Sequence, residues 1–407
     1  MKEKIYCGLD IGSQNIKAGL LRVKNFREIE LIGAALTPTR GYQKGSINDL
    51  AEFTECLEAT FEELSQRTGY KIKETTVGVN ADLIDVRDSQ AAIPLLEGGS
   101  KVIAERDVEK VNKQARLLGI NIEQAPLHDL PQNYIIDDVS FSVNPLGLYG
   151  RKLAVCSLLI AASSDKIRNI TKAIHQAGYE AVDFYFSSYM AAQMCLEENC
   201  RSRGCALIDI GSEVTSLLIF KDKILRYVRR IDMGADQLTE KIAEELDFSF
   251  QLAEDIKKSY AAVVGFDANS EEEILIKRGD MYVPLKRRRV DEAMEPQIQK
   301  LIVKIKEALK ESEFLSKIEQ GIFMIGGGSL LSGLLERLSQ ELKLPVNMGQ
   351  LKIPSKKSLE NAAVFSSAFG LALSAFSQSS DYLSEKTQPQ GVRRMITRLV
   401  DVYQQYF

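Results

Sequence analysis

The sequence predicts an α/β fold built from two related halves that face each other across a phosphate-binding cleft. Residues 6–12 (YCGLDIG) and 205–211 (CALIDIG) are closely similar, although about half of the chain separates them. Each segment reads as an apolar strand that ends in Asp-Ile-Gly, followed by a short polar turn and a second apolar run. A third signal is the cluster GGGS at residues 326–329, which follows a further apolar strand.

A strand that ends on a carboxylate and turns through glycine can present backbone N–H groups to an anion and hold the carboxylate near a hydrated metal ion. One such strand would be weak evidence. Two copies, one in each half, together with the glycine cluster indicate the actin-like (duplicated ribonuclease H-like) two-lobed fold, with a nucleotide site between the lobes.

The composition is that of a packed, multidomain globular protein. The chain has 407 residues, enough for two or more domains, and its hydrophobic content of 45% is ordinary for such units. A formal net charge of −4 argues against a general nucleic-acid binder, which would carry a basic excess. No secretory pattern follows Met1, and the apolar runs at 153–162 and 362–376 are shorter than a membrane-spanning helix. We therefore expect a cytoplasmic protein.

Six cysteines in a chain of this length do not suggest a disulfide framework. Cys195, Cys200 and Cys205 recur at a regular interval, but the spacing fits no zinc pattern and neither histidine lies nearby in sequence. We expect buried free thiols, because an unmodified cysteine usually packs as a small apolar residue.

Changes of pattern along the chain predict two inserted units. The two actin-like halves are expected at 1–81 with 165–200 and at 201–233 with 317–376. A small α+β domain (82–164) interrupts the first half, and a charged, mostly helical lobe (234–316) interrupts the second. Residues 377–390 contain few apolar side chains and read as a flexible linker to an amphipathic helix at 391–407.

Periodicity predicts the individual elements. A β-hairpin is expected at 5–23, and apolar side chains at helical spacing predict a long amphipathic helix at 49–68. The other expected strands are 31–36, 75–80, 155–161 and 322–325, and the other expected helices are 105–118, 165–177, 187–198 and 330–342.

The first turn carries the groups that a polyphosphate requires. Gly12 lets the backbone approach the ligand, Ser13 offers a hydroxyl, and Lys17 places an ammonium at the turn. The alternative for this segment alone is a plain β-hairpin with a solvent-exposed lysine, and the second copy argues against it.

The second turn departs from this chemistry. Its Asp-Ile-Gly is intact, but Ser212, Glu213 and Val214 stand where further glycines and a hydroxyl would suit phosphate better. If Glu213 points inward, it would repel a phosphate by about 4 kcal/mol at about 4 Å and an effective dielectric constant of about 20. It could instead point to solvent or be bridged by a cation. We expect a nucleotide to bind and hydrolysis to be weak at most.

Four further stretches complete the pattern: RGYQKG (40–45), HDLPQNY (128–134) with Asp137, NPLGLYG (144–150) and AEDIK (253–257). Together with the two turns, they make the chain resemble the FtsA family of actin-like bacterial cell-division proteins over nearly its whole length. The first three are more specific than the ATP motifs, which sugar kinases and chaperones of the same superfamily share. The unit at 82–164 stands where that family carries a small domain in place of one actin subdomain.

The resemblance implies an ATP site with Mg²⁺. From the first half, the phosphates and the Mg²⁺ shell would be held by Asp10, Gly12, Ser13, Gln14, Asn15 and Lys17. From the second half, the corresponding residues would be Asp209, Gly211 and Ser212, with Lys257 by the adenine and Gly326, Gly327, Gly328 and Ser329 by the adenosine. Asp10 and Asp209 would reach the metal through water. The protein would act mainly as a scaffold.

The resemblance also implies partners. These are other copies in filaments, the C-terminal tail of the tubulin-like FtsZ on the charged lobe, and later division proteins on the inserted domain. Two departures from the family concern the ATP site and the FtsZ site. The second turn lacks the usual Gly-Gly-Thr, and Gln297 stands where an arginine commonly follows Glu-Pro. The run Lys286, Arg287, Arg288 and Arg289 either supplies the missing cation or is a solvated helix start.

Residues 391–407 predict a helix that lies in a membrane surface. An apolar and aromatic stripe runs along one face and three arginines lie off it; these residues are Val392, Met395, Ile396, Leu399, Val402, Tyr403, Tyr406 and Phe407, with Arg393, Arg394 and Arg398. As a helix the segment is about 25 Å long, too short and too charged to cross a bilayer. The alternative is that it packs on its own domain or on a partner.

We therefore expect a peripheral protein at the cytoplasmic face of the cell membrane that tethers the FtsZ ring at the division site. Three alternatives stay open from the sequence. A small-molecule kinase would need a carboxylate base and a substrate pocket that no motif marks. A pilus-assembly relative would lack the tail and the long charged lobe. A diverged FtsA paralogue could have lost ATP, and Glu213 is the reason to consider it.

Overall fold

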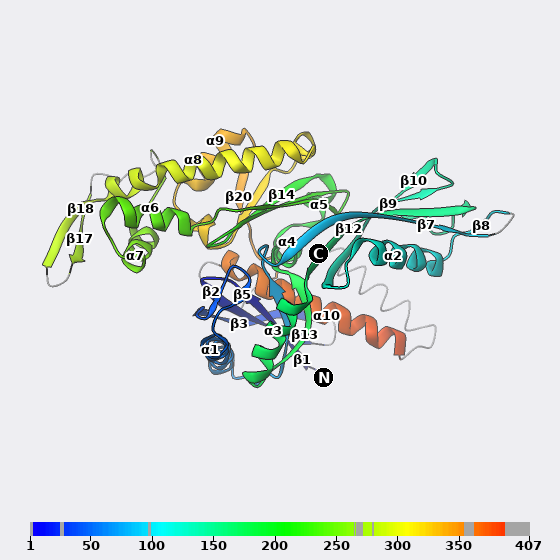
Figure 1. The fold of residues 1–407 in the computed structure, drawn as a ribbon, viewed down its shortest axis with the longest axis horizontal. Coiled ribbons are helices and arrows are strands. Elements are labelled where there is room, and N and C mark those ends of the chain that lie inside the picture. The colour runs from blue at the N-terminus through cyan, green and yellow to red at the C-terminus, as the bar shows by residue number, and fades with distance from the viewer. Residues whose placement is uncertain are drawn as a thin grey trace.

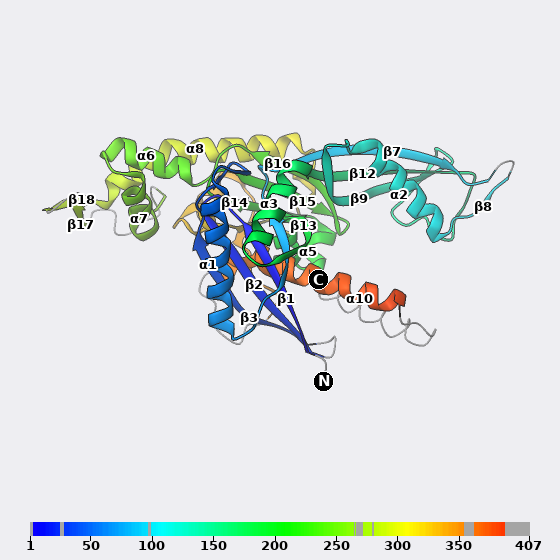
Figure 2. The ribbon, with the colours of Figure 1, turned by 60° about the horizontal axis from the view of Figure 1, so that its bottom comes forward.

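The computed structural model describes residues 3–24, 28–96, 99–263, 265, 272–278, 281–353 and 362–386. Two mixed sheets form the middle of the molecule (Figure 1). A third, smaller sheet extends to one end of the long axis, and a two-stranded hairpin extends to the other, as both Figure 1 and Figure 2 show.

The first sheet has the strand order β13-β6-β1-β2-β3. Its strands are β1 (Glu3–Ile11), β2 (Asn15–Lys24), β3 (Glu28–Pro38), β6 (Glu74–Val79) and β13 (Glu180–Phe186). Helices α1 (Leu50–Thr68) and α3 (Ser164–Gln176) cover one face, and α4 (Ser187–Cys195) and α10 (Ser366–Lys386) cover the other.

Helix α1 shows how local sequence sets these boundaries. The Asp49 carboxylate accepts the N–H groups of Ala51 and Glu52 and so caps the helix start. The helix ends at Gly69, whose φ of 76° is left-handed. Between these ends the predicted apolar stripe is buried against the first sheet.

The second sheet repeats the first, with the order β16-β15-β14-β19-β20. Its strands are β14 (Cys205–Ile210), β15 (Thr215–Lys221), β16 (Ile224–Ile231), β19 (Ile322–Ile325) and β20 (Val346–Met348). In each sheet the Asp-Ile-Gly strand pairs antiparallel with the strand after it and parallel with a later one: β1 with β2 and β6, and β14 with β15 and β19. The predicted duplication is therefore confirmed at the level of topology.

The inserted sheet has the order β10-β9-β12-β7 and is antiparallel. Its strands are β7 (Ile84–Pro94), β9 (Gln124–Ile136), β10 (Ser140–Ser142) and β12 (Lys152–Ser163), and α2 (Glu105–Gly119) packs on β7 and β12. Two short pairs accompany the larger sheets: β4 (Tyr42–Gln43) with β5 (Ser46–Ile47), and β8 (Lys101–Val102) with β11 (Tyr149–Gly150).

The charged lobe combines helices with a hairpin. The helices are α6 (Asp236–Leu246), α7 (Phe250–Tyr260) and α8 (Arg287–Glu311), and the hairpin is β17 (Glu273–Arg278) with β18 (Met281–Lys286). The sequence predicted a mostly helical lobe and did not find this hairpin. Its alternating pattern is short and lies between two strongly helical stretches.

Two predicted helices differ from the structure in their boundaries. The helix expected at 187–198 is divided into α4 and α5 (Glu198–Arg203). The helix expected at 330–342 begins only at α9 (Leu334–Leu342), because Gly333 has a left-handed φ of 79° and the glycine cluster itself forms the 3₁₀ turn η2 (Gly327–Leu330). Two further 3₁₀ turns are η1 (Leu315–Lys317) and η3 (Ala362–Phe365).

The flexible linker expected at 377–390 is wrong in its first part, because α10 continues to Lys386. Side chains of the first half hold this stretch: Ser379 hydrogen-bonds the Tyr6 hydroxyl at 2.7 Å, and Gln378 donates to Asp183 at 3.3 Å. Residues 387–390 and the tail at 391–407, with every predicted membrane-binding residue, lie outside the described residues.

Helix α10 packs unusually closely on its neighbours. An added Cβ at Gly370 would lie 2.1 Å from the Met190 carbonyl oxygen of α4, and one at Gly8 would lie 2.1 Å from the Ala368 carbonyl oxygen of α10. The apolar run at 362–376 is thus accounted for by burial against strand and helix. In the part of the chain that the structure describes, no helix is both long and apolar enough to span a membrane.

We predict that Gly8→Ala lowers the free energy of unfolding by about 2–3 kcal/mol, because the added methyl group collides with backbone atoms that cannot rotate away. Urea unfolding followed by circular dichroism measures this change. The matched control is Gly99→Ala, whose Cβ would lie 3.4 Å from Leu96 Cδ2. The control should stay within about 0.5 kcal/mol of the parent protein. Equal unfolding free energies for the two variants would contradict the close packing of α10 on β1.

Candidate functional site

The two Asp-Ile-Gly turns have the same backbone geometry. The Gly12 N–H donates to the Asn15 carbonyl at 3.1 Å, and the Gly211 N–H donates to the Val214 carbonyl at 3.0 Å. A Cβ at Gly12 would lie 2.8 Å from the Asn15 carbonyl oxygen, and one at Gly211 would lie 2.9 Å from that of Val214. Both turns therefore need glycine at the same place for the same steric reason.

Two adjacent serines bring the two turns together. Helix α4 begins directly after β13, and its first residue, Ser187, donates to Asp10 Oδ1 at 2.6 Å. The next residue, Ser188, donates to Asp209 Oδ2 at 2.8 Å. The start of one helix thus binds the carboxylate of each half.

The Asp10 carboxylate is almost fully buried and has two further contacts. Ser367 of α10 donates to its Oδ2 at 2.5 Å, and the Lys17 ammonium lies 3.2 Å from the same oxygen. Asp10 and Lys17 are direct neighbours across the β1–β2 ladder. A carboxylate can accept about four hydrogen bonds, so Asp10 keeps room for about one more donor, such as a metal-bound water.

Asp209 lies opposite Asp10, and the two carboxyl groups interact electrostatically. Burial raises the pKa of the Asp209 carboxyl, and the charge of Asp10 raises it further, while the Lys17 ammonium and the Ser188 hydroxyl lower it. Lys17 therefore interacts with the carboxylates of both halves.

Glu213 links the second turn to the first half. Its Oε2 accepts a short hydrogen bond from the Ser13 hydroxyl and a second from the Lys44 backbone N–H at 3.1 Å. Lys44 lies in the turn between β4 and β5, within the RGYQKG stretch, and has a left-handed φ of 47°. The inward orientation considered from the sequence is the one that the structure has.

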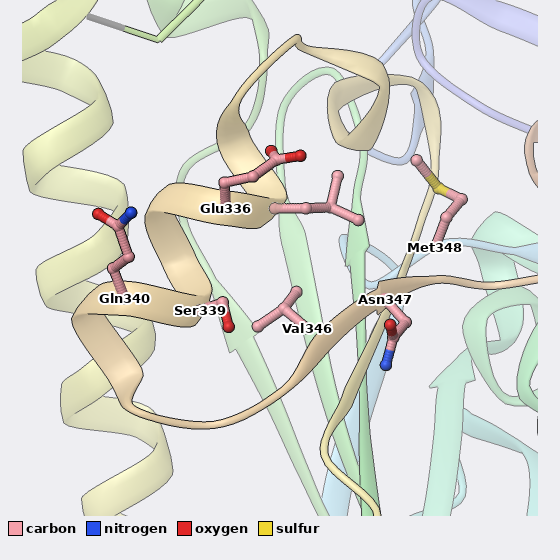
Figure 3. A pocket seen from close by; sticks show the side chains of 7 residues that line it. Glu336, Ser339, Gln340, Val346, Asn347 and Met348 are labelled. Carbon is pink, nitrogen blue, oxygen red and sulfur yellow. The ribbon is translucent and has the colours of Figure 1, made fainter. Parts of the chain in front are cut away.

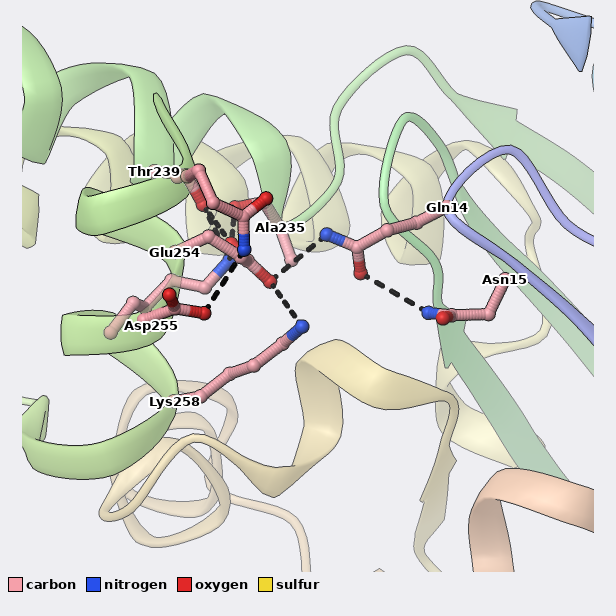
Figure 4. Close-up of polar contacts among 9 residues, drawn as sticks. Gln14, Asn15, Ala235, Thr239, Glu254, Asp255 and Lys258 are labelled. Atoms are coloured by element: carbon pink, nitrogen blue, oxygen red, sulfur yellow. Dashed lines mark hydrogen bonds and ion pairs between the residues drawn. The ribbon is translucent and has the colours of Figure 1, made fainter. Parts of the chain in front are cut away.

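A second polar bridge links the first turn to the charged lobe (Figure 4). The Gln14 amide donates to Glu254 Oε1 at 3.0 Å. The other oxygen of Glu254 lies 2.6 Å from the Lys257 ammonium, which also donates to the Ala235 carbonyl at 2.9 Å and to the Thr239 hydroxyl at 2.6 Å. The ammonium of Lys257 thus has three protein acceptors, and only its alkyl stem remains available to an adenine ring.

This cluster shifts two carboxyl pKa values in opposite directions. Burial alone would raise the pKa of Glu254, but hydrogen bonds from Lys257 and Thr239 lower it to about 2. Burial raises the pKa of Asp236 to about 6, because the Lys257 charge only partly offsets desolvation and the charges of Glu254 and Glu213. Asp236 Oδ1 is buried without a hydrogen-bond partner in the described residues.

The glycine cluster lies beside Asp209. Gly326 has a left-handed φ of 85°, and a Cβ there would lie 2.5 Å from Asp209 Oδ1. The Ser329 hydroxyl donates to the Gly326 carbonyl at 2.7 Å, so it stabilises its own turn. The close approach of this backbone to the end of β14 is the kind of contact that the predicted adenosine-side loop requires.

The structure thus brings most of the predicted nucleotide residues to one place. The first turn (Asp10, Gly12, Ser13, Gln14, Asn15, Lys17), the second turn (Asp209, Gly211, Ser212) and the sites at Lys257 and Gly326 to Ser329 are joined by the contacts above. The predicted basic run is elsewhere. It follows β18 at the outer end of the charged lobe (Figure 1), where Arg287 donates to the Tyr260 carbonyl and pairs with Glu272.

Sequence reasoning missed the serines. Ser187, Ser188 and Ser367 hold the two aspartates, yet each lies outside the glycine-rich motifs. The available signal was a Ser-Ser pair at a strand-to-helix junction. That signal is ambiguous, because serine is equally common at helix starts as a capping residue.

The HDLPQNY stretch joins the inserted domain to both halves. His128 Nε2 accepts the Phe186 N–H at 3.0 Å, one residue before Ser187. Burial lowers the pKa of His128 to about 3, so the ring is neutral and can accept this bond. Gln132 donates to the Leu225 carbonyl of β16 at 3.0 Å and accepts from Arg226 through its own carbonyl at 2.9 Å.

A surface pocket of about 420 Å³ lies between α9 and β20 (Figure 3). Its lining contains one carboxylate and no cation: Leu335, Glu336, Ser339, Gln340, Val346, Asn347 and Met348. The pocket has none of the paired charges of the cleft.

Comparison with known proteins relates the chain to bacterial cell division. The family model described as cell division protein FtsA matches residues 206–370, and the model of the SHS2 domain inserted in FtsA matches residues 83–161. The chain is 27% identical to cell division protein FtsA of Pseudomonas aeruginosa over 94% of its own length and 91% of that protein. It is 24% identical to the Escherichia coli K12 protein of the same name over 90% of its own length and 89% of that protein.

Solved structures share the fold. A PilM-PilN type IV pilus biogenesis complex gives a TM-score of 0.66 at 20% identity, covering 91% of this chain and 98% of that one. MreB5 of Spiroplasma citri bound to ADP gives 0.54 at 14% identity, covering 94% and 99%. These similarities confirm the actin-like architecture. They do not favour the pilus-assembly alternative, because identity at this level shows the fold alone.

We predict that the difference in unfolding free energy between Asp236→Asn and the parent protein increases as the pH rises from 4 to 7. The folded-state pKa of Asp236, about 6, exceeds its ordinary value, so the folded protein holds this proton more tightly than the unfolded chain does. Stability is therefore lost as the pH rises through this range, and the neutral asparagine removes that loss. Urea unfolding at each pH unit measures it, with the exposed Asp255→Asn as control. A difference that is the same at pH 4 and pH 7 would contradict the raised pKa.

Proposed function

This chain belongs to the FtsA family of cell division proteins, and on that premise we propose that it is an ATP-binding scaffold that anchors the division machinery to the membrane. The observation that carries the proposal is the pair of equivalent Asp-Ile-Gly turns whose carboxylates are bound by Ser187 and Ser188. This arrangement places two glycine turns, two acids and a lysine at the junction of the two halves.

We propose that the ligand of this junction is ATP with Mg²⁺. The steric need for glycine at Gly12, Gly211 and Gly326 fits a site where backbone must approach phosphates and sugar. A structural relative, MreB5, is bound to ADP in its solved form. Asp10 and Asp209 fit an Mg²⁺ ion held by one or two carboxylates, waters and phosphate oxygens.

The cleft is better suited to holding a nucleotide than to rapid hydrolysis. Both oxygens of Asp10 and one oxygen of Asp209 already accept hydrogen bonds from serine hydroxyls. These bonds hold the carboxylates in place and make them less available as catalytic bases. Lys17 balances part of the negative charge. We therefore propose that bound nucleotide controls how the two halves are held and, through them, self-association into filaments.

We propose that the FtsZ C-terminal tail docks on the charged lobe near the start of α8. Lys286, Arg288 and Arg289 are exposed there. Arg288 pairs with Glu292 at 2.7 Å, and Arg287 donates to the Tyr260 carbonyl and pairs with Glu272. Gln297 lies further along the same helix, α8, and is partly buried. These exposed cations lie at the start of the helix that carries Gln297, the position at which the family commonly has arginine.

We propose that later division proteins bind the inserted domain. Its outer part exposes large apolar side chains that a water-facing surface does not need, among them Val139, Phe141 and Tyr149, each at least 70% exposed. The hairpin β17–β18 at the other end of the molecule exposes Met281 and Tyr282. Apolar surface at both ends of the long axis also supports assembly of copies into filaments.

We propose that residues 391–407 attach the protein to the cytoplasmic face of the membrane. The support is the amphipathic pattern of this segment, with apolar and aromatic residues on one stripe and arginines beside it. Each arginine near an anionic surface contributes about 1 kcal/mol, so one copy binds reversibly and an assembly binds firmly.

We predict that Asp10→Asn reduces the gain in ATP affinity that Mg²⁺ provides by about tenfold, because the amide removes the charge of Asp10 from the metal shell and keeps an acceptor at only one of its two oxygen positions. Isothermal titration with ATP, with and without Mg²⁺, measures this gain. The exposed Asp165→Asn on α3 is the control and should behave as the parent protein does. An unchanged Mg²⁺ dependence in Asp10→Asn would show that Asp10 is not part of the metal shell.

We predict that Ile396→Glu with Leu399→Glu abolishes co-sedimentation of the full chain with anionic vesicles, because two charges then interrupt the apolar stripe. Gln404→Glu with Gln405→Glu adds the same charge off the stripe and should reduce binding only by a few fold. In dividing cells, a fluorescent fusion should form mid-cell bands that disperse when 391–407 are removed. Lipid binding that survives the stripe variant would rule out the membrane anchor.

A further inference from the structure

Glu213 bridges the cleft through donors that belong to the first half. The Ser13 hydroxyl and the Lys44 N–H both donate to Glu213 Oε2, and each comes from a turn of the first half. Glu213 itself belongs to the second turn. A hydroxyl and a backbone N–H that converge on one oxygen form a small anion site, and in this structure the anion in it is a side-chain carboxylate.

In both turns, the side chain at the position of Glu213 reaches the opposite half of the molecule. Gln14 and Glu213 are both the second residue after the turn glycine, between the matching bonds from Gly12 to Asn15 and from Gly211 to Val214. Both side chains reach the opposite half: Gln14 contacts Glu254 at 3.0 Å, and Glu213 contacts Ser13. The first turn contributes a neutral amide to its bridge, and the second turn contributes a charged carboxylate.

The surroundings of Glu213 offer little compensation for its charge. Within the ranges that the structure describes, no lysine or arginine lies within ion-pair distance of it. The negative charge of Glu213 acts on three nearby groups: the carboxylates of Asp82 and Asp236 and the hydroxyl of Tyr42. Each of these groups has a buried oxygen without a hydrogen-bond partner in those ranges. Arg230 pairs with Asp82 at 3.1 Å, but a second anion placed here would still meet the negative charge of Glu213 at short range.

We propose that the Glu213 carboxylate occupies the donors that a phosphate oxygen of ATP would use, and that Glu213 is therefore the residue that limits the affinity of this cleft for ATP. The inference rests on the proposed nucleotide function and assigns a specific role within it. ATP binding must displace Glu213 from Ser13 and Lys44 or accept its repulsion at short range. The effect acts on the phosphates and leaves the recognition of adenosine untouched.

The experiment compares full-length Glu213→Gln, Glu213→Gly and the parent protein. Glutamine keeps an oxygen that can accept from Ser13 and Lys44 and removes only the charge, whereas glycine removes the bridge as well. The charge-matched control is Glu240→Gln, an exposed residue of α6. The probes are ATP with Mg²⁺ and adenosine alone, titrated by calorimetry, and thermal unfolding confirms that each variant is folded.

We expect Glu213→Gln to bind ATP at least tenfold more tightly than the parent protein and Glu213→Gly to bind it at least as tightly as Glu213→Gln. The affinity for adenosine should stay within about twofold, and Glu240→Gln should match the parent protein with both ligands. If the parent protein binds ATP and Glu213→Gln binds it equally or more weakly, the role assigned to Glu213 is wrong while the nucleotide function stands. If all the folded variants fail to bind ATP and adenosine at millimolar concentration, both proposals are overturned.

Discussion

The rest of the structure depends on the hydrogen bonds at the start of α4. Two carboxylates from different halves must approach each other, and like charges in a partly dry environment repel. Ser187 and Ser188 donate one hydroxyl hydrogen bond to each, the N-terminal end of α4 adds a favourable partial charge, and Lys17 interacts with both acids. These contacts fix where β1 and β14 end relative to each other. The positions of both glycine turns follow from that.

The inserted domain is joined to the same point. His128 accepts the Phe186 N–H, and Phe186 is the residue from which α4 starts. Four residues further along β9, Gln132 hydrogen-bonds the backbone of β16 in the second half. The buried imidazole is neutral, so its Nε2 can accept the bond from the Phe186 N–H. This stretch, one of the three that are more specific than the ATP motifs, therefore acts as a structural joint between three units.

The sequence was sufficient for what depends on local spacing. The two Asp-Ile-Gly turns, the hairpins that carry them and the buried face of α1 follow from glycine sterics and helical periodicity, and all are found in the structure. What depends on contacts between distant segments could not be predicted. The polar composition of 377–386 suggests a linker, but Tyr6 hydrogen-bonds Ser379 from another part of the chain and the helix continues. The direction of Glu213 likewise depends on where Ser13 and Lys44 lie in space.

Duplication supplies the geometry of the cleft, and the side chains that differ between the copies supply its chemistry. The backbone bonds and the need for glycine are the same in both turns. The residues that cross the cleft are different: a neutral amide from the first turn and a carboxylate from the second. Each bridge is a hydrogen bond between side chains of the two halves. A ligand that binds there must therefore compete with internal contacts, so its affinity depends on these two side chains more than on the fold.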